Sequence, residues 1–140
     1  MNNNLEKEKI IFYDGDCVFC NKTVQWIIKH DKNNRFKFSP QNSEFAKNFL
    51  KPVREKFNYL DSIIYYSDGK FYVEFEATIE ILSEIYIFFK TIKKIFKFKI
   101  FIVIGNFFYR IIAKYRKKFL NNHCIIISGV NNEFKDKFIY

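Results

Sequence analysis

The chain has 140 residues, of which 49% are hydrophobic and 28% are charged, and its formal net charge is +9. That length fits one compact domain, and an apolar fraction near one half excludes a disordered chain. Ten of the 24 lysines and arginines lie between residues 85 and 118, where no Asp or Glu occurs. The positive charge therefore belongs to one local block, and the rest of the chain is nearly neutral.

Membrane-spanning and secreted classes are not favoured. The first nine residues, MNNNLEKEK, lack the apolar core of a secretory signal. The longest strongly apolar run, residues 100–109, has about half the length that a membrane-spanning helix needs. Three cysteines are too few for the disulfide scaffold of a small secreted protein. We therefore expect a cytoplasmic protein with reduced thiols.

The amino-terminal segment predicts a strand followed by a helix. Residues 9–13 are a short apolar run rich in strand-forming side chains, and the turn sequence Asp14-Gly15-Asp16 ends it. From Cys17 onward, apolar residues recur at helical spacing, which predicts a helix with one buried side. The buried side is expected to consist of Cys20, Val24, Ile27 and Ile28.

The middle of the chain continues the alternation of strands and helices. Residues 35–39 alternate between polar and apolar side chains, which predicts a strand. Ser43 is suited to cap a short helix, which we expect Pro52 to end. Residues 62–66 and 71–73 flank an Asp-Gly turn and predict a β-hairpin.

Two basic amphipathic helices are expected after the hairpin. The first begins near Glu76, and in both helices the lysines lie across from an apolar stripe. The stripes consist of Ile81, Ile85, Phe88, Ile92 and Ile95 in the first helix, and of Phe108, Ile112, Tyr115 and Phe119 in the second. We expect both stripes to cover the sheet. The order β-α-β-α-β-β-α, with additional C-terminal basic helices, predicts one α/β domain over residues 1–140, in which residues 85–140 are a helical extension.

The residues best suited to catalysis, Cys17 and Cys20, lie at the junction of the first predicted strand and the first predicted helix. Cys17 is expected among the unpaired N–H groups of the helix start, which favour its thiolate. Cys20 follows one turn later, within reach to resolve a mixed disulfide. In a strand–helix context the spacing Cys-x-x-Cys is typical of a thioredoxin-type redox pair. The alternative is a pair of half-buried structural cysteines.

Residues 13–21, YDGDCVFCN, resemble the Asp-x-x-Cys-x-x-Cys signature of the DCC family of thiol-disulfide oxidoreductases. The resemblance continues through residues 36–40, 61–64 and 68–69 and through the basic stretch 109–119. It implies a thioredoxin-like α/β fold and an enzyme that exchanges a Cys17–Cys20 disulfide with a protein or a low-molecular-weight thiol. No cofactor and no metal are expected for this chemistry.

This chain departs from thioredoxins in one respect. They place a cis-proline just before the third strand, beside the cysteines, whereas this chain has Leu60-Asp61-Ser62 there. Generic protein-disulfide exchange and a specialised substrate therefore both stay open.

Two carboxylates lie beside the cysteine pair. The negative charges of Asp14 and Asp16 oppose the Cys17 thiolate, so we expect a pair that is reducing rather than strongly oxidising. We assign Asp14 as a proton shuttle for the cysteines. Its alternative is ordinary turn chemistry at the end of a strand, which is also our interpretation of Asp16.

Three other functions use some of the same residues. Asp14 and Asp16 imitate the opening of haloacid-dehalogenase-type phosphatases, but the paired acids that bind magnesium in that class do not follow. A Cys₃His zinc site is a second alternative, and a redox-sensing module without turnover is a third. The zinc ligands would be Cys17, Cys20, His123 and Cys124.

The basic helices suggest a further partner. An apolar stripe opposed by lysines suits either core packing or peripheral contact with an anionic membrane, and such contact is compatible with redox chemistry. Nucleic acid is not favoured, because no binding signature accompanies the charge.

Overall fold

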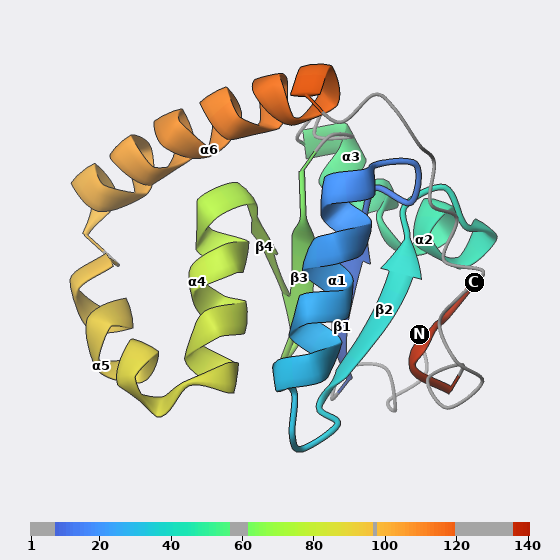
Figure 1. Ribbon diagram of the computed structural model, residues 1–140, viewed down its shortest axis with the longest axis horizontal. Helices are drawn as coiled ribbons and strands as arrows, with labels where there is room; N and C mark the ends of the chain where they lie inside the picture. The colour runs from blue at the N-terminus through green and yellow to red at the C-terminus, as the bar shows by residue number, and fades with distance from the viewer. Residues whose placement is uncertain (1–7, 57–61, 97, 120–135) are drawn as a thin grey trace.

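The computed structural model describes residues 8–56, 62–96, 98–119 and 136–140. Its described part contains a four-stranded sheet of order β2-β1-β3-β4, in which β1 is parallel to β2 and antiparallel to β3 (Figure 1). The elements are β1 (Lys9–Tyr13), α1 (Val18–His30), β2 (Phe36–Pro40), α2 (Glu44–Phe49), α3 (Lys51–Lys56), β3 (Ile64–Ser67), β4 (Lys70–Val73), α4 (Glu74–Ile85), α5 (Ile87–Phe96) and α6 (Lys99–Phe119).

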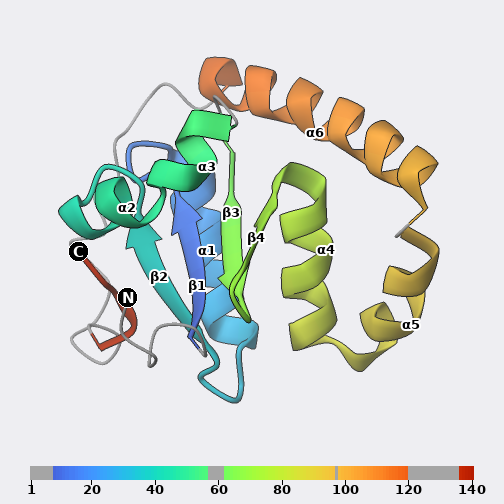
Figure 2. The same ribbon diagram turned by 180° about the vertical axis from the view of Figure 1, so that it is seen from behind.

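Helices cover both faces of the sheet, because alternate residues of each strand point to opposite sides. Ile11 and Tyr13 of β1 face the core beneath α1 and α4, whereas Ile10 and Phe12 face the core beneath α2 and α3. Figure 1 shows α1 in front of the sheet, and Figure 2 shows α2 and α3 on the other side. This three-layer arrangement confirms the α/β domain that the order of elements predicted and is consistent with the thioredoxin-like fold that the resemblance implied.

Local signals account for most of the element boundaries. Ser43 caps α2, since its Oγ accepts a hydrogen bond from the Ala46 N–H at 3.1 Å. Asp68 and Gly69 both have positive φ angles, as the tight turn of the predicted hairpin requires. The expectation that Pro52 ends the helical segment is wrong. Pro52 lies in the first turn of α3, where the missing N–H of proline has no helical partner to lose.

The expected continuous helix from Glu76 is also wrong. Tyr86 has an extended backbone (φ −120°, ψ 122°) and separates α4 from α5. The predicted stripe of the first helix assumes that this helix is unbroken. The extended residue Tyr86 redirects the chain, so every later side chain points in a different direction. Ile81 is accordingly buried, whereas Phe88 and Ile95 are 68% and 53% exposed.

The stripe predicted on α6 faces away from the sheet. Phe108, Ile112 and Tyr115 are more than half exposed, and the side chain of Phe119 lies outside the described part. The side of α6 that packs on α4 adjoins this stripe and includes Gly105, where a Cβ atom would overlap the ring of Phe75. The lack of a side chain at Gly105 therefore decides which face of the helix is buried.

The last described residues return to the sheet. Phe138 forms a parallel bridge with Phe38 of β2, and the Ile139 N–H donates to the Phe38 carbonyl at 2.8 Å. The segment after residue 85 is thus not helical throughout. Within the described ranges, no helix combines the length and the apolar character that crossing a bilayer requires.

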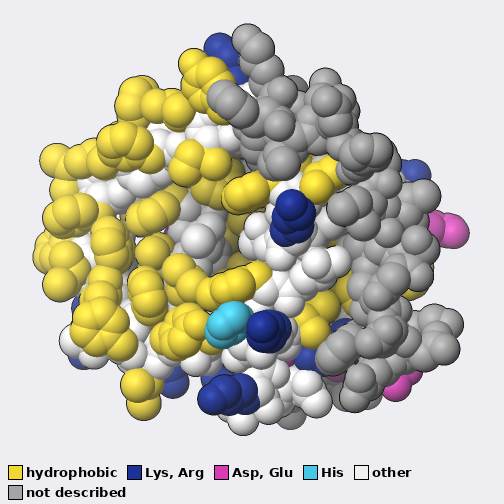
Figure 3. Space-filling model, viewed as in Figure 1, with side chains coloured by type: hydrophobic (Ala, Val, Ile, Leu, Met, Phe, Trp, Pro, Cys, Tyr) yellow, Lys and Arg dark blue, Asp and Glu magenta, His cyan; other side chains and the backbone are white. Residues whose placement is uncertain are grey.

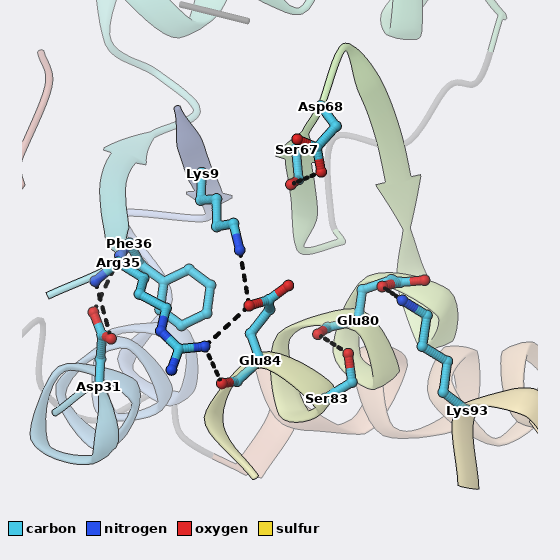
Figure 4. Close-up of polar contacts among 10 residues, drawn as sticks. All are labelled: Lys9, Asp31, Arg35, Phe36, Ser67, Asp68, Glu80, Ser83, Glu84 and Lys93. Carbon is cyan, nitrogen blue, oxygen red and sulfur yellow. Dashed lines mark hydrogen bonds and ion pairs between the residues drawn. The ribbon is translucent and has the colours of Figure 1, made fainter. Parts of the chain in front are cut away.

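Glu84 at the end of α4 ties the helix to the strands (Figure 4). Its Oε2 lies 2.8 Å from Lys9 Nζ and 3.1 Å from Arg35 Nη1. Burial by itself raises the pKa of Glu84, but the hydrogen bonds and charges of Lys9 and Arg35 outweigh burial and hold this pKa below its usual value.

We predict that Glu84→Gln lowers the free energy of unfolding by about 1 kcal/mol at neutral pH. Because the folded-state pKa is depressed, this stabilisation is present above the unfolded-state pKa and is lost as pH falls through the folded-state value. Urea unfolding between pH 7 and pH 3 measures the difference, which should shrink toward the acid end. Glu55→Gln, at an exposed position of α3, is the matched control. Parallel stability curves for the wild type and Glu84→Gln would contradict the prediction.

Candidate active site

The two cysteines lie at the start of α1, directly after β1, as the sequence predicted. Cys17 is the N-cap residue, with an extended backbone (φ −94°, ψ 115°), and Cys20 lies in the first helical turn. Neither forms a disulfide, and they are 9% and 8% exposed respectively. The first turn of a helix carries N–H groups without a partner inside the helix, so this position favours an anion.

A hydrogen-bonded turn presents the pair. The Asp14 carbonyl accepts from the Cys17 N–H at 3.2 Å, and Asp14 Oδ1 accepts from the Asp16 N–H at 3.1 Å. Asp14 therefore has the turn role that was its alternative interpretation, through one of its two carboxylate oxygens. Asp16 is exposed.

Asn21 is a positioning residue for which the sequence analysis gave no role. It is 5% exposed, and its Nδ2 donates to the Gly15 carbonyl at 3.0 Å. This bond ties the first turn of α1 to the loop that precedes it. In the sequence, the position of Asn21 directly after Cys20 was the signal that could have identified it. A buried amide beside a reactive turn requires hydrogen-bond partners.

The end of β2 packs against the turn that precedes α1. A Cβ atom on Gly15 would lie 3.3 Å from Pro40 Cβ at the end of β2, so the loop packs closely there. Gln41 then links two strand ends: its N–H donates to the Tyr13 carbonyl at 2.9 Å, and its Nε2 donates to the Ser62 carbonyl at 2.6 Å. The end of β1 and the segment before β3 are thereby held together.

That segment is where thioredoxins have their cis-proline. Ser62 is buried, and Leu60 and Asp61 lie outside the described residues. Across the ranges that the structure describes, every peptide bond is trans.

Tyr13 forms part of the environment of the cysteines. Burial raises the pKa of its hydroxyl, and the nearby Tyr140 and Cys20 raise this pKa further. Tyr13 therefore stays protonated and neutral at physiological pH.

Helix α6 crosses the end of the sheet at which β3 begins, in both views (Figure 1, Figure 2). The Tyr109 hydroxyl accepts from the Ile63 N–H at 2.9 Å. One residue further along α6, Arg110 Nε donates to Glu74 Oε1 at 2.9 Å. Glu74 is 3% exposed and has a positive φ of 54°. Its carboxylate is thus engaged by an arginine, which does not suit the magnesium site of a phosphatase.

The zinc alternative rests partly on residues outside the described part, since His123 and Cys124 both lie there. Among the residues that the structure does describe, no three His, Cys, Asp or Glu side chains form a group that could hold a metal ion.

Comparison with known proteins identifies the family of this chain. A family model described as DCC1-like thiol-disulfide oxidoreductase matches residues 11–122. The chain belongs to this family. The match includes both cysteines and extends through all of α6, so the basic helix lies within the family region.

Two curated relatives match more than half of the chain. The uncharacterized protein YuxK of Bacillus subtilis (strain 168) is 30% identical over 77 residues, which cover 55% of this chain and 56% of YuxK. A chloroplastic DCC family protein of Arabidopsis thaliana is 28% identical over 80 residues, which cover 57% of this chain and 46% of that protein. The chain thus spans about half the length of these relatives. No solved structure gives a significant match.

Proposed function

We propose that the protein is a dithiol–disulfide oxidoreductase in which Cys17 is the nucleophile and Cys20 is the resolving cysteine. The observation that carries this proposal is the position of two cysteines outside any disulfide, Cys17 at the N-cap and Cys20 in the first turn of α1, in a chain of the DCC1-like family. Cys17 directly precedes the unpaired N–H groups of the first helical turn, and the three-residue separation brings Cys20 one turn away.

The proposed reaction transfers two electrons from the protein to a disulfide. The Cys17 thiolate attacks one sulfur of the substrate disulfide, so that a Cys17–substrate bond forms and the first substrate thiol leaves. Cys20 then loses its proton and attacks Cys17 Sγ, which releases the second substrate thiol. The protein ends as a Cys17–Cys20 disulfide, and an external dithiol must reduce it before the next turnover.

Asp14 is proposed as the group that takes the proton from Cys20 and returns it during re-reduction. One of its oxygens serves the turn, and the side chain is only partly buried, so it can exchange protons with water. The carboxylate also disfavours accumulation of thiolate nearby, which favours a reducing pair.

The substrate class that we propose is a protein or low-molecular-weight disulfide. Cys17 is 9% exposed, whereas the ring of Phe19, two residues on, is 41% exposed. A disulfide flanked by an apolar group could rest on this ring while its sulfur reaches Cys17. We expect the reaction to occur in the cytoplasm, where thiols are kept reduced.

The reduction potential of the cysteine pair tests the proposal. We expect one reversible Cys17–Cys20 disulfide with a potential near that of thioredoxin, about −270 mV. Equilibration in dithiothreitol buffers, followed by alkylation and mass analysis, measures the oxidised fraction. Cys124→Ser should leave the value unchanged. Failure to form this disulfide, or stoichiometric zinc that blocks alkylation of both thiols, would overturn the proposal.

A further inference from the structure

The outer face of α5 and α6 exposes an unusual amount of apolar surface. Figure 3 shows hydrophobic side chains gathered over these two helices. Ile87 and Phe88 of α5 are 83% and 68% exposed, and Val103 and Phe107 of α6 are 67% and 62% exposed. Monomeric proteins rarely leave a continuous apolar surface uncovered, and such surfaces mark partner or membrane contacts.

These apolar side chains of α6 are exposed although another side of the helix is already packed against the rest of the protein. Gly105 and Tyr109 already hold α6 against α4 and the start of β3. Phe107 lies two residues from both, so at about 100° per residue its side chain points to the opposite side. The apolar outer face is therefore a second face of α6, in addition to the packed one.

Positive charge borders the outer face. Lys90 and Lys94 follow Ile87 by three and seven residues, and Lys114 follows Phe107 by seven, so each shares the side of an exposed apolar residue. These three lysines are exposed and, within the described ranges, make no ion pair.

Two other cations of the same helices form ion pairs with acids of α4. Arg110 pairs with Glu74, and Lys93 pairs with Glu80. No Asp or Glu occurs between residues 85 and 118, so the charge left on the outer side is positive only.

We propose that the outer face of α5 and α6 binds the surface of an anionic lipid bilayer. The apolar side chains would enter the boundary between headgroups and acyl chains, and the bordering lysines would contact lipid phosphates. Charge complementarity favours this partner over a second copy of the chain, because two copies meeting through this face would bring the same lysines together. The inference is independent of the redox proposal, since no cysteine takes part in it.

Sedimentation with lipid vesicles tests the proposal. We expect the full chain to bind phosphatidylcholine vesicles containing about 30 mol% phosphatidylglycerol at least about tenfold more tightly than pure phosphatidylcholine vesicles, with weaker binding as salt rises. Lys90→Glu/Lys114→Glu should weaken binding to the anionic vesicles about tenfold or more. Lys47→Glu/Lys70→Glu makes the same change of net charge at exposed positions outside α5 and α6, and should change binding less than about twofold.

A separate variant tests whether the exposed apolar side chains contribute to vesicle binding. Val103→Glu/Phe107→Glu alters two outward side chains and should also abolish binding, while circular dichroism and the thermal midpoint show that the fold is kept. If Lys47→Glu/Lys70→Glu weakens vesicle binding as much as Lys90→Glu/Lys114→Glu does, the proposal is overturned, because attraction by net charge alone would then explain the binding. Absence of vesicle binding would overturn it as well. A stable dimer would also overturn the proposal if Val103→Glu/Phe107→Glu dissociates it and vesicles do not compete with it. A second copy of the chain would then cover the face.

Discussion

Serine in place of Cys17 is expected to lower disulfide-reductase turnover at least about a hundredfold, to the level of the uncatalysed reaction. A hydroxyl at this position cannot form the mixed disulfide, and Cys20 lies inside the first turn with 8% exposure. The measurement is steady-state reduction of oxidised glutathione or of a small aromatic disulfide, with dithiothreitol as electron source. Cys124→Ser serves as the control and should keep wild-type turnover.

Cys20→Ser should behave differently, because the first attack remains possible and the second does not. We expect a covalent adduct between Cys17 and half of the substrate, visible by mass spectrometry and reversed by excess dithiothreitol. This pair of variants separates the roles of the two thiols, which a simple loss of activity cannot do. Full turnover in both single variants would eliminate the assignment of Cys17 and Cys20.

Gly105→Leu is expected to lower the free energy of unfolding by up to about 3 kcal/mol. Any Cβ at this position overlaps the ring of Phe75. That ring also packs edge-on against Phe96 of α5, with centroids 5.6 Å apart, so its displacement disturbs the junction of α4, α5 and α6. The cost should exceed the gain of about 1 kcal/mol that replacing a mid-helix glycine otherwise brings.

A double-mutant cycle shows whether the clash is the cause. In the Phe75→Leu background the ring is gone, so Gly105→Ala should become neutral or stabilising, although it destabilises the wild type. Val103→Ala, on the exposed side of α6, is a control for changes of helix propensity. Equal effects of Gly105→Ala in both backgrounds would show that α6 does not approach α4 through Gly105. Urea unfolding followed by circular dichroism provides the free energies.

The site is predictable from sequence where short-range interactions define it. The order of a strand, a turn and a helix around Cys17 follows from residues within a few positions of one another. The same holds for the Ser43 cap and for the Asp68-Gly69 turn of the hairpin. These features depend on local backbone geometry, so they do not require knowledge of the remaining chain.

The partners of the site come from distant positions, and no local pattern identifies them. Gln41 reaches Ser62, and Tyr109 reaches Ile63 across 46 residues. Such contacts exist only because the strands of the sheet and α6 bring these residues together at one end of the sheet.

Amphipathic periodicity by itself determined that the helices after the hairpin have apolar stripes with lysines across from them. It did not determine which side is buried: of the two stripes, Ile81 and Ile85 pack in the core against the sheet, whereas Phe88, Ile95 and the described part of the α6 stripe are exposed. The tertiary structure decided this through the break at Tyr86, the close approach at Gly105 and the pairing of Arg110 with the buried Glu74. The physical reason is that a period gives the direction of a stripe only relative to its own helix axis. Its direction relative to the sheet depends on steric fit and on charges supplied by other elements.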